Sequence, residues 1–267
     1  MGVLGLWRFL TRKGYEAVVI FQHSVPSNTS EPNPRYLIDV LGCIFMTILC
    51  AYSSLPLDWA HSVAEKALLI FAHPSSALIY LDGSPAEEKL LTHRSREKAR
   101  TEALSKADEC TTKLQDRVNQ KLRVRKQQFV TIKTLLRKAF YWSPDARRGL
   151  AQYLRSKGWT VIECATEADL KIASDCKAGD IVISSDSDML MYKNVTTIWR
   201  PISRQRFLVY RIPDILATLG VSRTQFTVLG LVSHNDYNRN IYGLGCSTNF
   251  SIIKELHGAG KFSYCTL

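Results

Sequence analysis

Four short apolar segments, separated by helical patterns, constrain the fold of this chain most strongly. Residues 36–39, 77–82, 159–163 and 180–184 each have the length and apolar content of a buried strand. Helical patterns at 43–52, 59–71, 145–157 and 166–176 separate these segments. Apolar strands joined through helices of this length predict a parallel sheet covered on both faces. The expected fold class is therefore α/β.

The later part of the chain predicts a different local structure. Residues 195–199 and 206–210, joined by "RPISRQ", have the pattern of an antiparallel hairpin. Helices are expected to follow from about Pro213 and from Ser222.

Basic residues are concentrated in one segment. Between Lys89 and Lys138, fifteen Lys/Arg stand against five Asp/Glu, a net charge of +10 where the whole chain has +11. The segment has no Pro or Gly and little apolar periodicity before Phe129, so it predicts one long, exposed, basic helix. A solvated helix usually mixes its charges more evenly. We therefore expect a polyanionic partner, although the charge alone does not choose between nucleic acid and an acidic membrane surface.

Acidic residues follow the predicted strands or begin the helices after them. Ligand sites in open parallel sheets lie outside the carboxyl ends of the strands, so acids placed there would converge at one edge. Several carboxylates in one pocket cannot all stay ionised without cations. The residues concerned are Asp39, Asp82, Glu167, Asp169, Asp186, Asp188 and Asp236.

Oxygen ligands without His or Cys favour Mg²⁺ or Mn²⁺. Two such ions about 4 Å apart would activate a water and stabilise the leaving oxygen of a phosphodiester. The alternative is structural. Asp39 and Asp82 would then merely end strands, while Glu167 and Asp188 would favour or cap helix N-termini. The shared position of all the acids, beside a strongly basic segment, favours the metal site.

Other classes of protein find little support. Neither a G-x-x-x-x-G-K-[ST] loop nor G-x-G-x-x-G after a strand occurs. The apolar run at 41–52 is too short to span a bilayer, and no membrane association is expected. Seven cysteines without C-x-x-C spacing predict reduced thiols in a nuclear or cytoplasmic protein. "KLRVRKQQ" favours the nucleus, although a nucleic-acid contact explains it equally well.

Motifs in order along the chain resemble those of the XPG/flap-endonuclease family of structure-specific 5′ nucleases, whose nuclease core has a PIN-like fold. They are "MGVLGLWRFL", "LIDV", "YLDGSP", "ATEADLKIA", "ISSDSDMLMY", "LGVSRTQFTVLGLVSHNDY" and "YGLG" followed by "STNFSIIKEL". The similarity runs from residue 1 to about residue 256. It implies a PIN-like parallel-sheet core at 1–210 with a basic helical arch at 86–138. It also implies a helical DNA-binding region of helix–hairpin–helix type at 211–267.

The resemblance further implies roles for individual residues. The seven acids would hold two Mg²⁺ or Mn²⁺ ions that serve hydrolysis of branched or 5′-ended DNA, with RNA as an alternative. Lys89 and Arg94 would be the catalytic Lys and Arg at the base of the arch, with Arg96 as the alternative to Arg94. Phe45 would stack on a base, or is a core phenylalanine. The other expected nucleic-acid contacts are Gly2, Arg96, Lys121, Arg123, Arg125, Lys126, Gly243 and Gly245, the two last in a hairpin that often holds K⁺.

Departures from the family pattern bear on the substrate. Asp169 replaces the usual Glu, Asn249 stands where Ala is usual, and His234-Asn235 replaces Gly-Cys. The chain ends at Leu267 without a clamp-binding tail. We expect a monomer whose C-terminal part is either lost or missing from the sequence. The otherwise whole acid set favours an enzyme; the alternative is a nuclease-fold protein that has lost catalysis and binds or regulates nucleic acid.

Overall fold

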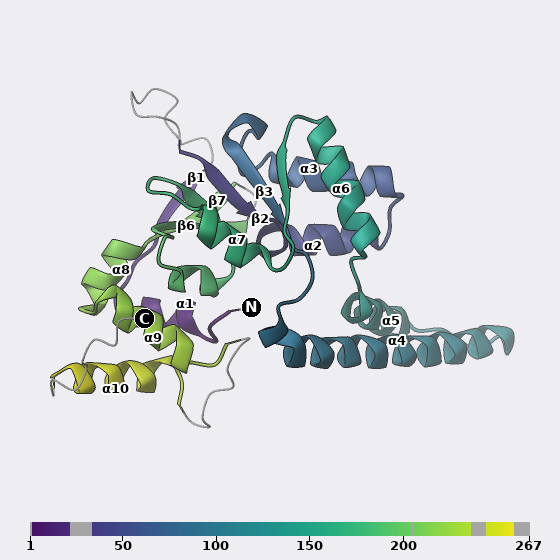
Figure 1. Ribbon diagram of the computed structural model, residues 1–267. Coiled ribbons are helices and arrows are strands. Elements are labelled where there is room, and N and C mark those ends of the chain that lie inside the picture. Colours follow the sequence, from purple (N-terminus) through teal and green to yellow (C-terminus); the bar gives the residue numbers. More distant parts are fainter. Residues whose placement is uncertain (1, 22–33, 204, 236–243, 259–267) are drawn as a thin grey trace.

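A seven-stranded sheet forms the centre of the protein in the computed structural model, which describes residues 2–21, 34–203, 205–235 and 244–258 (Figure 1). The strand order is β1-β7-β6-β5-β2-β3-β4. Strands β6, β5, β2, β3 and β4 run parallel, and β7 and then β1 add to them in antiparallel pairs. The bounds are β1 Val18–Phe21, β2 Tyr36–Asp39, β3 Ala77–Leu81, β4 Thr160–Glu163, β5 Ile181–Ile183, β6 Thr197–Ser203 and β7 Arg206–Arg211.

Helices cover both faces of this sheet and enclose two hydrophobic cores. Side chains of a strand alternate between faces. Leu37 accordingly lies in one core, and its neighbours Tyr36 and Ile38 lie in the other. The first core is closed by α1 (Leu6–Arg12), α7 (Ala168–Asp175), α8 (Ile212–Leu219), α9 (Arg223–Val232) and α10 (Cys246–Gly258). The second is closed by α2 (Val40–Tyr52), α3 (Leu57–Leu68) and α6 (Pro144–Ser156).

The sequence predicted most of this framework. The four apolar segments are parallel strands, and the predicted hairpin is β6–β7, with a bulge between Pro201 and Ser203. The short edge strand β1 was not predicted, because its partner β7 lies far away in the sequence and its own side chains are mostly exposed. The expected division near residue 210 crosses a shared core, since Leu6, Tyr210 and Phe250 belong to one cluster.

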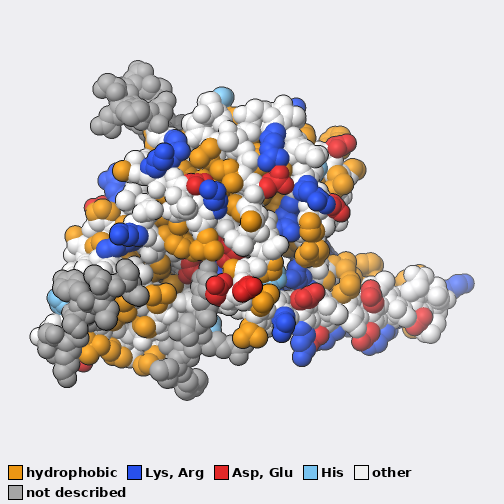
Figure 2. Space-filling model, in the orientation of Figure 1, with side chains coloured by type: hydrophobic (Ala, Val, Ile, Leu, Met, Phe, Trp, Pro, Cys, Tyr) orange, Lys and Arg blue, Asp and Glu red, His pale blue; other side chains and the backbone are white. Residues whose placement is uncertain are grey.

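The basic segment forms two helices, so the prediction of one long helix is wrong. α4 (Leu90–Asn119) and α5 (Lys126–Ala139) pack together as a hairpin that projects from the body of the protein (Figure 1). The chain turns without Gly or Pro, and Lys121 takes up a left-handed conformation, φ 57°. Acidic and basic side chains alternate along the visible side of α4 (Figure 2). At 1.5 Å per residue, α4 places the tip of this hairpin roughly 45 Å from its base.

Among the described helices, no single one combines the length and the apolarity needed to cross a membrane. α8 and α9 together meet that test but are bent by 87°. Asn249, the unusual residue in α10, is buried and ties α10 to the end of α9, because its side-chain amide donates to Val232 O (3.1 Å) and Ser233 Oγ (3.2 Å). A polar side chain at this position therefore has a structural role.

Candidate active site

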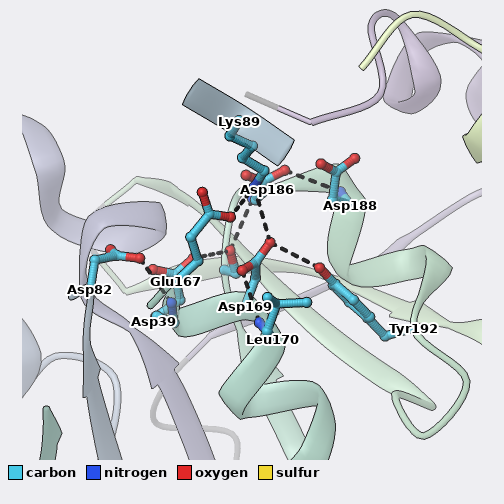
Figure 3. Close-up of polar contacts among 11 residues, drawn as sticks. Asp39, Asp82, Lys89, Glu167, Asp169, Leu170, Asp186, Asp188 and Tyr192 are labelled. Carbon is cyan, nitrogen blue, oxygen red and sulfur yellow. Dashed lines mark hydrogen bonds and ion pairs between the residues drawn. The ribbon is translucent and has the colours of Figure 1, made fainter. Parts of the chain in front are cut away.

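Carboxylates gather at the edge of the sheet where the parallel strands end. The order β5-β2-β3-β4 brings the carboxyl ends of these strands into line. Figure 3 shows the acids that follow them grouped around the side chain of Lys89. Six of the seven predicted acids are in this group: Asp39, Asp82, Glu167, Asp169, Asp186 and Asp188. Asp236 lies outside the described residues.

Lys89 supplies positive charge in the middle of the group. Its ammonium donates to Glu167 Oε2 and, at 3.5 Å, to Asp169 Oδ2. Lys89 is only 7% exposed, and a charge so buried needs partners of opposite sign. The short 3₁₀ turn Glu87–Lys89 leads directly into α4. The side chain of Lys89 therefore connects the base of the helical hairpin to the acid group.

Asp39 is the most deeply held of the acids. It caps α2, accepting from Gly42 N (2.9 Å), and it also accepts from Ser184 Oγ (2.8 Å). Burial, followed by the negative charge of Asp82, raises the pKa of Asp39 to about 7 despite these two hydrogen bonds. Gly42 is required here, since a Cβ atom would lie 2.1 Å from Asp39 Oδ2.

The turn after β3 is joined to the start of α7. Gly83 N donates to Thr166 O (2.6 Å), and Asp82 Oδ1 accepts from Ala168 N (2.9 Å). Arg147 Nη1 donates to the carbonyls of Asp82 (2.7 Å) and Gly83 (3.1 Å). Asp82 and Glu167 are thus held side by side although 85 positions separate them in the sequence. Burial is the main cause that raises the pKa of both carboxyls.

Asp169 has a partner that the sequence analysis missed. Its Oδ2 accepts from the Tyr192 hydroxyl (2.9 Å), and its Oδ1 accepts from Leu170 N (2.8 Å). Tyr192 ends the "DSDMLMY" motif, but nothing in that pattern distinguishes it from a core aromatic. The Tyr192 hydroxyl therefore fixes the orientation of the Asp169 carboxylate, whose side chain is one methylene shorter than the usual Glu.

Asp186 and Asp188 lie where β5 ends and a 3₁₀ helix (Ser187–Met191) begins. Asp186 Oδ1 accepts from Asp188 N (3.1 Å), so Asp186 caps this turn. Burial raises the pKa of Asp186, and Asp188 is itself buried. Gly2 packs against this pair: its φ is +92°, and a Cβ atom there would lie 2.1 Å from Asp186 Oδ1.

The chemistry of this site fits an oxygen-binding divalent cation. Burial is the main cause that raises the pKa values of Asp39, Asp82, Glu167 and Asp186, and a cation among these carboxyls would favour their ionised form. In the part of the chain that the structure describes, no three Asp, Glu, His or Cys side chains are already arranged to hold one ion. Two of the acids are instead bonded to the Lys89 ammonium. A divalent cation would therefore compete with Lys89 for these oxygens.

The remaining predicted residues are divided between the site and the hairpin. Arg94 is exposed on α4. Successive residues of an α-helix are rotated by about 100° about the helix axis. Arg96 therefore points within about 20° of the direction of Lys89, whereas Arg94 points about 140° away from it. The geometry therefore favours Arg96, the alternative, as the partner of Lys89.

Phe45 is 44% exposed on α2 and is not a core residue. Four basic residues predicted to contact nucleic acid lie exposed at the hairpin tip, far from the acids: Lys121, Arg123, Arg125 and Lys126. Gly245 is exposed just before α10, and Gly243 lies outside the described residues.

Comparison with known proteins identifies distant relatives. No protein-family model matches the chain. Flap endonuclease 1 of Glycine max is 32% identical over 112 residues, which cover 40% of this chain and 29% of that protein. Flap endonuclease 1 of Methanococcus aeolicus is 24% identical over 204 residues, covering 73% of this chain and 57% of that protein. The chain thus spans less than two thirds of the length of these relatives.

Solved structures have the same architecture. The catalytic core of Rad2 in complex with DNA substrate matches with a TM-score of 0.61 at 17% identity, over 98% of this chain and 74% of that chain. Flap endonuclease-1 from Methanococcus jannaschii matches with a TM-score of 0.53 at 17% identity, over 85% and 72%. The fold is therefore that of the Rad2 and flap-endonuclease nuclease cores. By sequence the chain is distantly related to flap endonuclease 1, and its fold is similar to the nuclease cores of Rad2 and flap endonuclease-1.

Proposed function

We propose that this protein is a divalent-metal-dependent nuclease that hydrolyses phosphodiester bonds in branched or 5′-ended DNA. One observation carries the proposal: acids from four separate parts of the chain meet around Lys89 at the base of a basic helical hairpin. The Rad2 core with which this chain shares its fold was solved with a DNA substrate, which supports DNA as the ligand.

The acids and the basic side chains would have separate tasks. Asp82, Glu167, Asp169, Asp186 and Asp188 would hold Mg²⁺ or Mn²⁺, with Asp39 and, outside the described residues, Asp236 completing the set. When bound, such ions supply an activated water and stabilise the leaving oxygen of a phosphodiester. Lys89, once it is no longer bonded to the acids, can donate to an oxygen of the scissile phosphate. Arg96 lies on the same side of α4, where it can orient that phosphate.

The test is hydrolysis of labelled 5′-flap, gapped, hairpin and single-stranded substrates, as DNA and as RNA, with Mg²⁺. The wild-type protein should cut a branched or 5′-ended DNA, and an Asp186→Ala/Asp188→Ala variant should not. Asp58→Asn/Asp145→Asn is the matched control, since it removes two exposed acids from helix N-termini. Equal cleavage by the wild type and the Asp186/Asp188 variant would mean that the activity does not come from this site.

One observation favours the alternative of a nuclease-fold protein without catalysis. The Lys89 ammonium pairs with both Glu167 and Asp169, so part of the negative charge of the site is offset without added ions. Titration with Mn²⁺ separates the two functions. Saturable Mn²⁺ binding together with DNA cleavage supports the nuclease. DNA binding without Mn²⁺ binding and without cleavage supports the nuclease-fold binding protein. A K⁺ ion at the helix–hairpin–helix element that begins with "YGLG" stays a prediction.

A further inference from the structure

An exposed aromatic side chain and a half-buried cationic side chain form a pair where the helical hairpin joins the body of the protein. The Arg100 guanidinium on α4 lies 5.2 Å from the ring centroid of Tyr141, in the short link between α5 and α6. Tyr141 is 58% exposed. A ring that is braced by a guanidinium but still largely exposed can stack on a further flat group.

This pair is connected to the acid site by a row of basic residues. His93, Arg96 and Arg100 follow Lys89 at spacings of four, three and four residues, which places them along one side of α4. His93 is close enough to the others for Arg100 and Arg96 to lower its pKa, although burial is the larger cause. At 1.5 Å per residue, Arg100 lies about 16 Å from Lys89, a distance that about five phosphates of one B-form strand would span.

A second aromatic surface lies beside the pair. The rings of Phe45, on α2, and Phe140, the residue before Tyr141, are 6.5 Å apart and meet edge to face. Phe45 is 44% exposed. Phe140 thus contacts the exposed Phe45 of α2, and its neighbour Tyr141 contacts Arg100 on α4. The combination of flat rings with a line of cations is the pattern that binds single strands, because rings stack on bases and cations pair with phosphates.

We propose that Tyr141 and Arg100 form a stacking platform for a base of single-stranded nucleic acid, with Arg96 and Arg100 contacting the adjacent phosphates. The proposal takes nucleic acid as the ligand from the proposed function, but it requires no catalysis. The platform is distinct from the basic residues at the hairpin tip. It implies that a single strand lies along the base of α4, close to the acids.

Binding of a short fluorescent oligothymidylate, measured by anisotropy in EDTA so that it is not cut, tests the platform. Tyr141→Ala should weaken binding about tenfold, the loss expected for one stacked base, whereas Tyr141→Phe should bind like the wild type. Phe21→Ala is the matched control, since Phe21 is a 53% exposed aromatic on the edge strand β1. Arg100→Ala should weaken binding more than Lys98→Ala, which removes the same charge from α4 two residues away.

Binding of an oligonucleotide of the same length with abasic sites in place of the bases separates the contribution of base stacking from that of phosphate charge. The wild type should bind it about tenfold more weakly than oligothymidylate, and Tyr141→Ala should lose this preference for bases. An oligouridylate probe tells DNA from RNA. If Tyr141→Ala binds as tightly as Phe21→Ala, or keeps the preference for bases, the platform is wrong even if the protein cleaves flaps. If the preference depends on Tyr141 while no cleavage occurs, the platform stands and the proposed nuclease function fails.

Discussion

The protonation of Asp39 should make the metal-free protein less stable as the pH rises. Its pKa is raised from 3.8 to about 7 in the folded state, mainly by burial. The folded protein therefore binds this proton more tightly than the unfolded chain does. The resulting stabilisation is fully present below pH 4 and is lost as the pH rises through 7. Because one pKa unit corresponds to about 1.4 kcal/mol, the loss attributable to Asp39 is on the order of 4 kcal/mol.

Urea unfolding in EDTA at several pH values from about 4.5 to about 8, which include the shifted pKa, measures this loss. The Asp39→Asn variant keeps the side-chain oxygen that caps α2 but has no proton to lose. The free energy of unfolding of the wild type should therefore fall relative to that of Asp39→Asn as the pH rises. Parallel curves for the two proteins across this range would refute the reasoning, because the other titrating groups are the same in both.

Mg²⁺ or Mn²⁺ should raise the unfolding temperature more at pH 8 than at pH 5, since protonation competes for the same oxygens; an equal rise at both values in thermal scans would contradict this. Tyr192→Phe removes the hydroxyl that Asp169 accepts from and should weaken Mn²⁺ affinity about 10- to 100-fold by calorimetry. Gly83→Ala would put a Cβ atom 2.0 Å from Cys164 O and should destabilise the fold by about 2 kcal/mol or more, unlike Gly258→Ala, which meets nothing within 4 Å. Asn249→Ala leaves Val232 O and Ser233 Oγ without this donor and should cost about 1–3 kcal/mol in urea unfolding.

The sequence was sufficient for the parallel strands and for the acids that follow them. Both depend on short-range patterns: apolar runs of strand length, and a polar residue where each run ends. Parallel pairing then brings those ends together, so the grouping of Asp39, Asp82 and Asp186 follows from local information and one topological rule.

Features that depend on distant partners were not predictable in the same way. The edge strand β1 exists because β7 offers it hydrogen bonds, and its own pattern is too short to indicate a strand. The helix break near Lys121 has no Gly or Pro to mark it. The hydrogen bonds from the Tyr192 hydroxyl and the Lys89 ammonium to Asp169 form only in the folded protein. The resemblance indicated a role for Lys89, but nothing in the sequence distinguished Tyr192 from a core aromatic residue.

The contact between Lys89 and the acids connects the charge of the site to the position of the hairpin, which the link between α5 and α6 also joins to the body of the protein. Only Ala103 and Ala107 of α4 are buried, so few side chains along its length oppose a change of tilt. A rotation of α4 by a few degrees at its first turn would move the tip of the hairpin by several ångströms, because α4 is roughly 45 Å long. Any ligand that takes the Lys89 ammonium away from the acids would thereby also remove one of the contacts that hold the hairpin against the body.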